Sequence, residues 1–403
     1  MKGIGGKSPE QALSELSDMT KDIEGISKGE FEQRIAKAQS IMKENGQAAI
    51  YLNAGTNLYY FTGLDWYASE RMVGAILPAS GDIQYIAPFF EVGSLQERRL
   101  IEGNMHTWQE EESPYELFHQ ILDSLNISTG SAIGLCESAA YFMVSGIQKV
   151  NNEFAWFNAA EVTNACRKTK SAHEIALIQR AMDMTLEVHR AAASVLYEGI
   201  TTTEVEQFIN EAHKRVGASG SYFVIVLFGE ASQYPHGVKD PQTLKQGDIV
   251  LIDTGCKLKG YHSDITRTYV FGTPNERQKQ VWQAEQNAQL AAFNAAQLGQ
   301  ECQKADEAAR ASLIADGFGP DYNLPGLPHR TGHGLGLDIH EGPYLVKGST
   351  DLLQVGMVFS NEPMLVVPGE FGVRLEDHFY MTDSGPKWFT EPSESIENPL
   401  NLA

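Results

Sequence analysis

The sequence predicts a two-domain α+β protein, with a smaller amino-terminal α/β domain before a larger carboxyl-terminal domain. A length of 403 residues is enough for two domains with separate cores. Helix-like and strand-like segments alternate up to about residue 160. From residue 171 onward, long helical patterns are followed by strands, as expected when helix pairs back a curved, mainly antiparallel sheet. We therefore predict an arm over residues 1–28, an α/β domain over 29–165 and the larger domain over 166–403.

The amino-terminal half begins with a polar, irregular segment. A loosely packed arm with one short helix, around Pro9 to Leu16, is expected there. Residues 30–46 then carry apolar side chains at helical spacing, and Gly46 ends the pattern. The strands and helices expected next have the sequences AAIYL, VGAILP, QYIAP, ELFHQILDSL, SAIGLC and EFAWFNA.

Two long helical patterns open the carboxyl-terminal half, HEIALIQRAMDMTLEVHRAAASVLY and TTTEVEQFINEAHKRVG. Thr202 or Thr203 is the expected N-cap of the second helix. Strands SYFVIVLFG, DIVLIDTG and ITRTYVFG follow. Two more helices are expected, from about Asn275 to Leu298 and from about Glu301 to Asp316.

Composition excludes several classes of protein. The net charge of −21 comes from 31 basic and 52 acidic residues, and the basic clusters are short and isolated, so nucleic acid is not an expected partner. No apolar stretch approaches the roughly 20 residues of a membrane-spanning helix. The first residues lack the apolar core of a secretory signal, and the four cysteines form no CxxC pattern. The expected location is the cytoplasm, without a membrane partner.

Five segments of the carboxyl-terminal half place an acid or an imidazole inside an apolar or glycine-flanked run. These residues are Asp253, Asp264, His333, Glu362 and Glu376. Burying a carboxylate is costly unless it is paired or bound to a cation. Four converging carboxylates would repel one another, whereas two divalent ions would neutralise them and hold a bridging water. The pattern therefore predicts a two-metal hydrolase.

The first two of these acids have a spacing that suits adjacent strands. Asp253 and Asp264 are eleven residues apart, with a turn expected at Lys257 to Gly260 between them. On two antiparallel strands joined by that turn, both side chains can point to one face of the sheet. Either acid alone could instead cap a turn.

The order Asp, Asp, His, Glu, Glu, in segments such as IVLIDTG, TGHGLGLDIHEG and GVRLEDHFYMT, resembles the pita-bread metallopeptidase family. That family includes methionine aminopeptidase, aminopeptidase P and prolidase. The resemblance is strong over residues 165–403 and looser over 30–150, where the chain is similar to the amino-terminal domain of the proline-specific branch. It implies a pita-bread catalytic domain with a smaller creatinase/prolidase-like α/β domain before it.

The resemblance also implies roles for individual residues. Asp253 would chelate one metal ion and Asp264 would bridge both, with His333, Glu362 and Glu376 completing the ligand set. Glu362 would also act as general base or proton shuttle, while His236 and His340 act in catalysis and His329 binds substrate. Oxygen-rich ligation with one imidazole suits Mn²⁺, Co²⁺, Fe²⁺ or Zn²⁺, and the family favours Mn²⁺.

Arg374 is a further candidate for substrate binding. Period-2 geometry places Arg374 and His378 on the same strand face as Glu376. Arg374 could clamp a substrate carboxylate through two hydrogen bonds, or it could orient a metal-binding carboxylate from behind. Both interpretations stay open at this point. His378 and His262, which adjoin ligand segments, are expected to be outer or surface groups.

We expect a metal-dependent Xaa-Pro dipeptidase that hydrolyses the imido bond of short proline-containing peptides through a metal-bridging hydroxide. The alternatives are an aminopeptidase P that acts on longer peptides and a non-peptide amide hydrolase such as ectoine hydrolase. A metal-free pita-bread binding module is a further alternative from another class. The family also implies a homodimer, in which the segment Trp66 to Met72 could close the pocket of the neighbouring subunit or simply form a surface loop.

Overall fold

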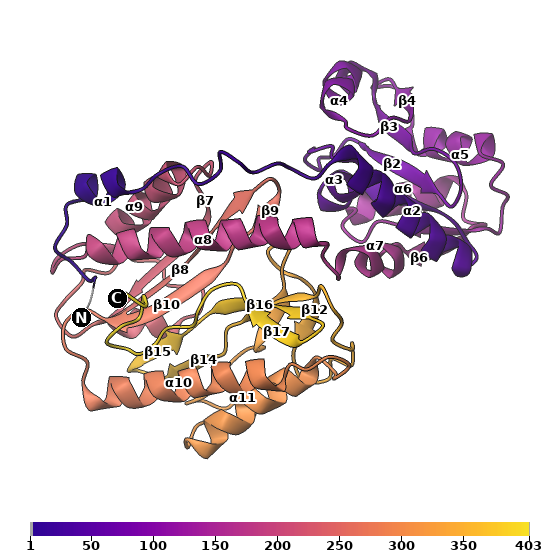
Figure 1. The fold of residues 1–403 in the computed structure, drawn as a ribbon. Coiled ribbons are helices and arrows are strands. Elements are labelled where there is room, and N and C mark those ends of the chain that lie inside the picture. The colour runs from indigo at the N-terminus through magenta and orange to yellow at the C-terminus, as the bar shows by residue number, and fades with distance from the viewer. Residues whose placement is uncertain (1–2, 403) are drawn as a thin grey trace. The chain divides into compact units, whose positions relative to one another are not determined.

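The computed structural model of the chain describes residues 3–402. The chain divides into two compact units: unit 1 has the bounds Met1–Gly25 and Lys168–Ala403, and unit 2 is Ile26–Arg167. Each unit contains both helices and strands, which confirms the predicted two-domain α+β fold class (Figure 1). No helix among residues 3–402 has both the length and the apolar character that crossing a bilayer requires.

Unit 2 is built on a mixed six-stranded sheet of order β4-β3-β2-β1-β5-β6. Its strands are β1 (Gln47–Asn53), β2 (Gly74–Pro78), β3 (Gln84–Pro88), β4 (Asn104–Trp108), β5 (Ala132–Leu135) and β6 (Ala155–Asn158). Its helices are α2 (Lys28–Glu44), α3 (Thr56–Thr62), η1 (Phe89–Glu91), α4 (Val92–Arg98), α5 (Pro114–Ser124), α6 (Tyr141–Val150) and α7 (Ala160–Arg167). One face of the sheet packs against Phe118 of α5 and Met143 of α6, whose side chains belong to the same buried cluster as Tyr51 of β1.

The first half of unit 1 contains two helices and a small antiparallel sheet. Helices α8 (Ala172–Ser194) and α9 (Thr202–Arg215) precede β7 (Ser221–Phe228), η2 (Gly229–Gln233), β8 (Ile249–Leu258), β9 (Tyr261–His262) and β10 (Ile265–Val270). The predicted N-cap of α9 at Thr202 or Thr203 was wrong. Thr201 caps this helix, because its hydroxyl accepts from the backbone N–H of Glu204 at 3.3 Å and the Glu204 carboxylate accepts from the backbone N–H of Thr201.

The second half of unit 1 repeats this order of two helices followed by strands. Its helices are α10 (Glu276–Ala295) and α11 (Gln303–Ala315). Its strands are β11 (Gly332–Gly334), β12 (Glu341–Leu345), β13 (Val358–Asn361), β14 (Met364–Val367), β15 (Phe371–Arg374), β16 (Asp377–Thr382) and β17 (Gly385–Trp388). Five of these strands form a sheet of order β12-β11-β13-β16-β17, and β14 pairs with β15.

A helix pair backs each half of unit 1. Helices α8 and α9 bury apolar side chains against β7, β8 and β10, whereas α10 and α11 do so against the strands of the second half. Figure 1 shows α8 along one side of this unit and α10 along the other, with the strands between them. The two halves meet where Thr266, on β10, forms an isolated antiparallel bridge with Glu376. The inner face of the strands is therefore the place where residues from both halves come together.

Residues 3–25 pack against the rest of unit 1 and are not the loose arm that was predicted. Helix α1 (Pro9–Glu15) contacts α8 and α9, and its Ala12 side chain is buried in their apolar cluster. The backbone N–H of Gly5 also donates to the carbonyl of Ala193 at 2.8 Å. Partly buried apolar side chains of the same segment, such as Leu13, Leu16 and Met19, pack against this cluster as well. The mostly polar composition of the segment gave no sign of this contact.

Candidate metal centre and cavity

Asp253 and Asp264 come from the antiparallel strands of the first half. Asp253 lies in β8, in register with Thr266 of β10, and Asp264 directly precedes β10. The turn predicted at Lys257 to Gly260 is present but shorter: only Lys259 and Gly260, with positive φ values of 49° and 93°, join β8 to β9. Such a two-residue turn suits the twist of antiparallel strands. Both acids are buried, with exposed fractions of 7% and 4%.

His333 sits at the centre of β11, between Gly332 and Gly334. A Cβ atom at Gly332 would lie 2.1 Å from the carbonyl oxygen of Ser360, and one at Gly334 would lie 2.5 Å from that of Glu341. Only glycine therefore lets β11 lie this close to its neighbours. The backbone N–H of His333 donates to Ser360 Oγ at 2.8 Å, which fixes the histidine beside β13.

Glu362 directly follows β13, and Glu376 directly precedes β16. The backbone N–H of Glu362 donates to the carbonyl of Thr331 at 2.9 Å, which ties it to the histidine segment. Glu376 donates its backbone N–H to the carbonyl of Thr266 at 3.1 Å, and the Thr266 hydroxyl donates to Glu376 Oε2 at 2.7 Å. Both halves of unit 1 thus hold Glu376 in place.

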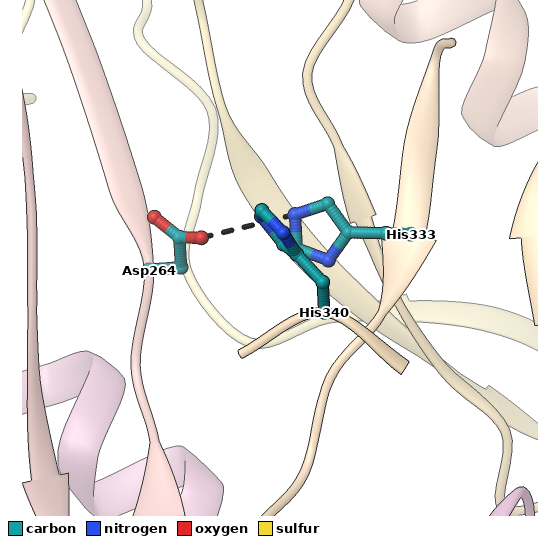
Figure 2. A group of neighbouring side chains, drawn as sticks. All are labelled: Asp264, His333 and His340. Carbon is teal, nitrogen blue, oxygen red and sulfur yellow. Dashed lines mark ion pairs between the residues drawn. The ribbon is translucent and has the colours of Figure 1, made fainter. Parts of the chain in front are cut away.

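The side chains of these residues converge. His333 Nε2 lies 3.0 Å from Glu362 Oε1 and 3.8 Å from Asp264 Oδ2. Three groups each have one potential ligand atom per residue within 4.8 Å of the others: Asp264 with His333 and His340, Asp264 with Glu376 and His378, and His333 with Glu362 and Glu376. Figure 2 shows the rings of His333 and His340 together beside the Asp264 carboxylate. The groups overlap, which is the arrangement expected of ligands that share neighbouring ions.

The electrostatics of the cluster fit bound cations. Burial, with the charge of nearby carboxylates, raises the pKa values of Asp264 and Glu376 well above their ordinary values. Three buried carboxylate oxygens, Asp253 Oδ1, Asp264 Oδ1 and Glu376 Oε1, accept no hydrogen bond from any donor of residues 3–402. A buried acceptor without a partner is costly, and a divalent ion would satisfy it while cancelling the repulsion. A donor set of carboxylate oxygens and imidazole nitrogens therefore fits the divalent ions predicted from the sequence.

A cavity of about 820 Å³ opens onto this cluster and accommodates a small ligand. Its lining includes all three of the histidines predicted for catalysis or substrate binding, His236, His329 and His340. Burial lowers the pKa of His340 to about 4, with the neighbouring His333 acting in the same direction. The remaining lining residues are Tyr222, Phe223, Ile225, Pro235, Asp253, Asp264, Tyr322, Pro328, Arg330, His333, Ile339, Glu362 and Arg374.

Arg374 lines the cavity, but its guanidinium group is engaged. Its Nη2 lies 2.6 Å from Asp253 Oδ2, its Nε donates to the Thr266 hydroxyl and its Nη1 donates to the carbonyl of Pro235. The side chain is only 4% exposed. Of the two interpretations left open by the sequence, this geometry favours the one in which Arg374 orients a carboxylate from behind.

Arg330 is the arginine that the sequence reasoning missed. It lines the same cavity, and its guanidinium carbon lies 4.3 Å from the ring centroid of Tyr344. Among the described residues, no carboxylate lies within ion-pair distance of it. The signal was available in the sequence HRTGHG, where this cation directly follows His329.

Helix α11 holds the loop that carries His329 and Arg330. Asp306 and Arg310 form a buried ion pair at 2.9 Å one turn apart. The guanidinium group of Arg310 also donates to the carbonyls of Asp321, Leu327 and His329. Because one rigid guanidinium group binds three carbonyls of the loop that ends in His329 and Arg330, this loop has little freedom to move.

Of the two places expected for His378 and His262, behind the ligands or at the surface, their burial excludes the surface. Their exposed fractions are 0% and 1%. His262 Nδ1 lies 3.2 Å from the carbonyl of Gly336, close to the histidine segment. His378 lies among the carboxylates, and neither of its ring nitrogens has a hydrogen-bond partner among the described residues. Its position two residues after Glu376 was the sequence signal for this placement.

Comparisons with known proteins agree with this architecture. Residues 176–383 match Metallopeptidase family M24, and residues 34–169 match the Creatinase/Prolidase N-terminal domain. The Xaa-Pro dipeptidase of Pyrococcus furiosus is 29% identical, over 91% of this chain and 100% of that protein. The crystal structure of dipeptidase PepE from Mycobacterium ulcerans superposes with a TM-score of 0.84 at 31% identity, over 91% of this chain and 97% of that one. The structure of a prolidase from Thermococcus sibiricus gives 0.82 at 29% identity, over 90% and 97%.

Proposed function

The chain belongs to metallopeptidase family M24, and on that premise we propose that it is a dipeptidase that hydrolyses the Xaa-Pro bond with the help of two divalent ions. One observation carries the proposal: carboxylates and imidazoles from both halves of unit 1, among them Asp264, His333, Glu362 and Glu376, converge beside a cavity that Asp253 also lines and that is large enough for a dipeptide. Relatives named as Xaa-Pro dipeptidase and prolidase support the choice of substrate.

In this proposal Asp253, Asp264, His333, Glu362 and Glu376 hold the ions. Divalent ions bound there lower the pKa of water and offset the negative charge that develops on the scissile carbonyl oxygen. The contacts already described hold the ligands in place: Thr266 positions Glu376, Ser360 positions His333, and Arg374 positions Asp253. Hydrogen bonds of this kind orient ligands before an ion arrives.

Glu362 is the proposed proton acceptor. Its carboxylate is 15% exposed, more than the side chains of Asp264 and His333, and therefore meets the cavity. It takes a proton from the attacking water and passes it to the nitrogen of the departing proline. His340 and His236 line the cavity, so they are placed to donate hydrogen bonds to the carbonyl oxygen and to hold the scissile bond.

The preference for a dipeptide needs a cation for the free carboxylate of the second residue. Arg374 is already paired with Asp253, so we assign this role to Arg330 instead. Its contact with the Tyr344 ring holds the guanidinium plane, and a planar guanidinium can bind a carboxylate through two parallel hydrogen bonds. Apolar lining residues, Phe223, Ile225 and Ile339, offer packing for the pyrrolidine ring or for an apolar first residue.

The remaining parts of the proposal concern the ion and the cellular context. Mn²⁺ is the proposed ion, because hard oxygen donors with a single imidazole suit it. The proposed location is the cytoplasm, where four buried free cysteines stay reduced. A homodimer, with Trp66 to Met72 at the pocket of the neighbouring subunit, is the proposed assembly.

A panel of peptides tests the substrate assignment. The Mn²⁺-loaded protein should cleave Xaa-Pro dipeptides well above Xaa-Pro-Xaa tripeptides and carboxyl-amidated dipeptides, because only the dipeptide places a free carboxylate next to the scissile bond. Equal or better cleavage of the longer peptides would favour an aminopeptidase P. Release of product from ectoine alone would favour the non-peptide amidase.

Two arginine variants test whether Arg330 or Arg374 binds the free carboxylate of the substrate. Arg330→Met should erode the preference for the free acid over the amide, with metal content unchanged, because its guanidinium group contacts no proposed ligand. Arg374→Lys should instead lower turnover on all substrates alike, since it loosens Asp253. If Arg374→Lys erodes the free-acid preference and Arg330→Met lowers turnover on all substrates alike, then Arg374 binds the substrate carboxylate.

A further inference from the structure

The carboxyl-terminal segment, residues 389–402, lies beyond the part of the chain that matches family M24, which ends at residue 383. It contains no helix or strand, only a bridge between Ser395 and Asn398. Its side chains are nevertheless packed: Thr390, Ser393 and Leu400 are 5%, 2% and 1% exposed. A segment without regular structure that is buried this well needs an explanation.

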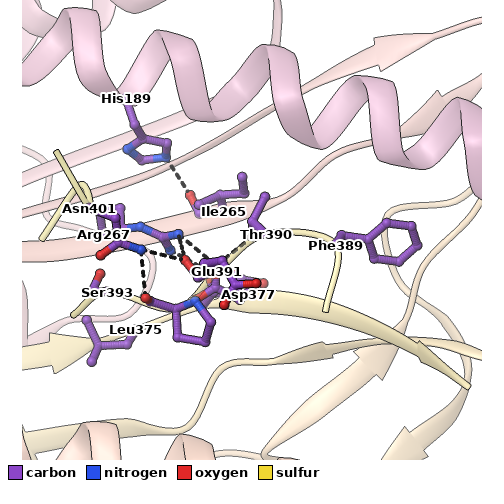
Figure 3. Close-up of polar contacts among 12 residues, drawn as sticks. His189, Ile265, Arg267, Leu375, Asp377, Phe389, Thr390, Glu391, Ser393 and Asn401 are labelled. Carbon is purple, nitrogen blue, oxygen red and sulfur yellow. Dashed lines mark hydrogen bonds and ion pairs between the residues drawn. The ribbon is translucent and has the colours of Figure 1, made fainter. Parts of the chain in front are cut away.

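Hydrogen bonds connect the segment to the strand that follows Glu376. The Thr390 hydroxyl donates to Asp377 Oδ1 at 2.6 Å, and the backbone N–H of Phe389 donates to the carbonyl of His378 at 2.9 Å. The carbonyl of Glu391 accepts from Arg267 Nη2 at 3.5 Å. Figure 3 shows the segment wrapped against Arg267 and Asp377 in this way.

Arg267 and Asp377, which directly follows the proposed ligand Glu376, form a buried ion pair. Arg267 Nη2 lies 2.7 Å from Asp377 Oδ1, and the two side chains are 1% and 0% exposed. Arg267 Nη1 donates to the carbonyls of Thr266 at 3.1 Å and Glu376 at 2.9 Å. One guanidinium group therefore holds both residues of the bridge that joins the two halves of the unit.

Gln289, on helix α10, completes the network from the other side. Its Nε2 lies 3.2 Å from Asp377 Oδ2 and donates to the carbonyls of Leu375 and Asn361 at 3.1 and 3.3 Å. Asn361 and Leu375 directly precede Glu362 and Glu376 in the sequence. The side chain of Asp377 is thus the point where the carboxyl-terminal segment, β10 and α10 all meet.

From this geometry we infer that Thr390 is a positioning residue for metal binding, which acts through Asp377 and Arg267 on the backbone that carries Glu362 and Glu376. The inference rests on the proposed function, since it needs these two glutamates to be ligands. Within residues 3–402, Asp377 Oδ1 accepts hydrogen bonds from two donors, Arg267 and Thr390. When the Thr390 hydroxyl is lost, the Asp377 carboxylate shifts toward its remaining donors. The guanidinium group of Arg267 moves with it, and so do the carbonyls of Thr266 and Glu376 that this group binds.

Thr390→Val tests the inference, because valine keeps the shape of threonine and removes only the hydroxyl. We expect the dissociation constant for Mn²⁺, measured from the paramagnetic resonance signal of the free ion, to rise up to about 10-fold, because removal of a group bonded directly to a metal ligand costs 10-fold or more and Thr390 acts one step further away. Thr390→Ser restores the hydroxyl and should restore the affinity. Circular dichroism at the temperature of the titration verifies that each variant is folded.

Ser393→Ala is the matched control. Ser393 is buried in the same segment, but its hydroxyl donates to the carbonyl of Pro399 and does not contact Asp377. Its loss should leave the Mn²⁺ affinity unchanged. Wild-type affinity in Thr390→Val, failure of Thr390→Ser to restore binding, or an equal loss in Ser393→Ala would each overturn the inference.

If Thr390→Val does not fold, Gln289→Met tests the contact between helix α10 and Asp377 instead. It removes the donors to Asp377, Leu375 and Asn361, and it should also weaken Mn²⁺ binding. A folded Gln289→Met protein with wild-type affinity would overturn the inference as well. The wild-type titration distinguishes the positioning role of Thr390 from the proposed metal centre. A native chain that binds no Mn²⁺ contradicts the metal centre itself.

Discussion

The residues of the cavity have two proposed roles, ion ligand and substrate contact, and the two sets differ in their backbone setting. The proposed ligands lie within strands or directly beside their ends, where hydrogen bonds fix them. His236 and His340 instead lie in exposed loop segments at the cavity wall. A loop histidine can follow a substrate that changes shape during the reaction, whereas a ligand must stay in place.

This division predicts the behaviour of two histidine variants. His340→Ala and His236→Ala should keep their metal content yet lose roughly 10²-fold or more in turnover, the usual range for a lost proton-transfer or oxyanion contact. Metal analysis and steady-state kinetics of the same preparations measure both quantities. His173→Ala, on α8 and outside the cavity lining, is the control and should behave as the wild type. Loss of metal in His340→Ala would make that residue a ligand.

At the scale of elements, helix α11 acts as a support for the substrate side of the cavity. Asp306 and Arg310 hold the loop that ends in His329 and Arg330, while none of the proposed ligands bonds to the guanidinium group of Arg310. The helix should therefore influence substrate binding more than metal binding.

Arg310→Lys separates these two effects. Lysine keeps a positive charge for the buried Asp306, but it cannot reproduce the rigid fork that reaches the carbonyls of Asp321, Leu327 and His329. We expect KM for the dipeptide to rise about 10-fold, a loss equal to roughly one such hydrogen bond, with unchanged metal content. Lys304→Gln, at an exposed position of the same helix, is the control. A normal KM in Arg310→Lys would mean that the loop holds its shape without α11.

The sequence predicted most elements correctly where one signal was enough. Periodicity located the long helices, and the five interrupted apolar runs located the acids that converge in the structure. Prediction from the sequence failed where a contact between residues far apart in the chain determines the position of a side chain or helix. Arg374 pairs with Asp253 across 121 positions, and the segment that precedes α1 donates the backbone N–H of Gly5 to the carbonyl of Ala193 on α8. The sequence also gave no indication that residues 389–402, which have no regular structure, are tied to Asp377.

For the whole molecule, two buried histidines make the acid stability of unit 1 predictable. His213 bonds to Ser221 and Thr185, and His189 bonds to the carbonyl of Ile265. Burial lowers their pKa values to about 4 and about 3, so both are neutral in the folded chain at pH 7. In the unfolded chain each histidine has a pKa near 6.5, so as the pH falls the unfolded chain binds these protons before the folded chain does. Their contribution to stability is therefore complete above pH 6.5 and is lost as the pH falls toward 4 and 3.

His213→Gln isolates one of these contributions. Between pH 7.5 and pH 5, the free energy of unfolding of the wild type should fall by about 2 kcal/mol more than that of the variant, since each pH unit below 6.5 is worth about 1.4 kcal/mol per depressed histidine. Urea unfolding at the two pH values measures this difference. Comparison with a variant is needed, because Asp264 and Glu376, with raised pKa values, have the opposite pH dependence. Parallel pH profiles for the two proteins would show that His213 does not titrate in this range.

Metal stoichiometry tests the central claim most directly. The account predicts that the native chain binds two Mn²⁺ ions, and that Asp264→Asn and Glu376→Gln each abolish binding of both while the chain stays folded, because each change deletes a charge that the two cations share. Asp351→Asn, an exposed acid of the same unit, should keep both ions. Metal analysis of the dialysed proteins gives the answer. Two ions in the wild type and none in the two site variants is the predicted result. A native chain without metal, or a full complement in Asp264→Asn or Glu376→Gln, would contradict the account.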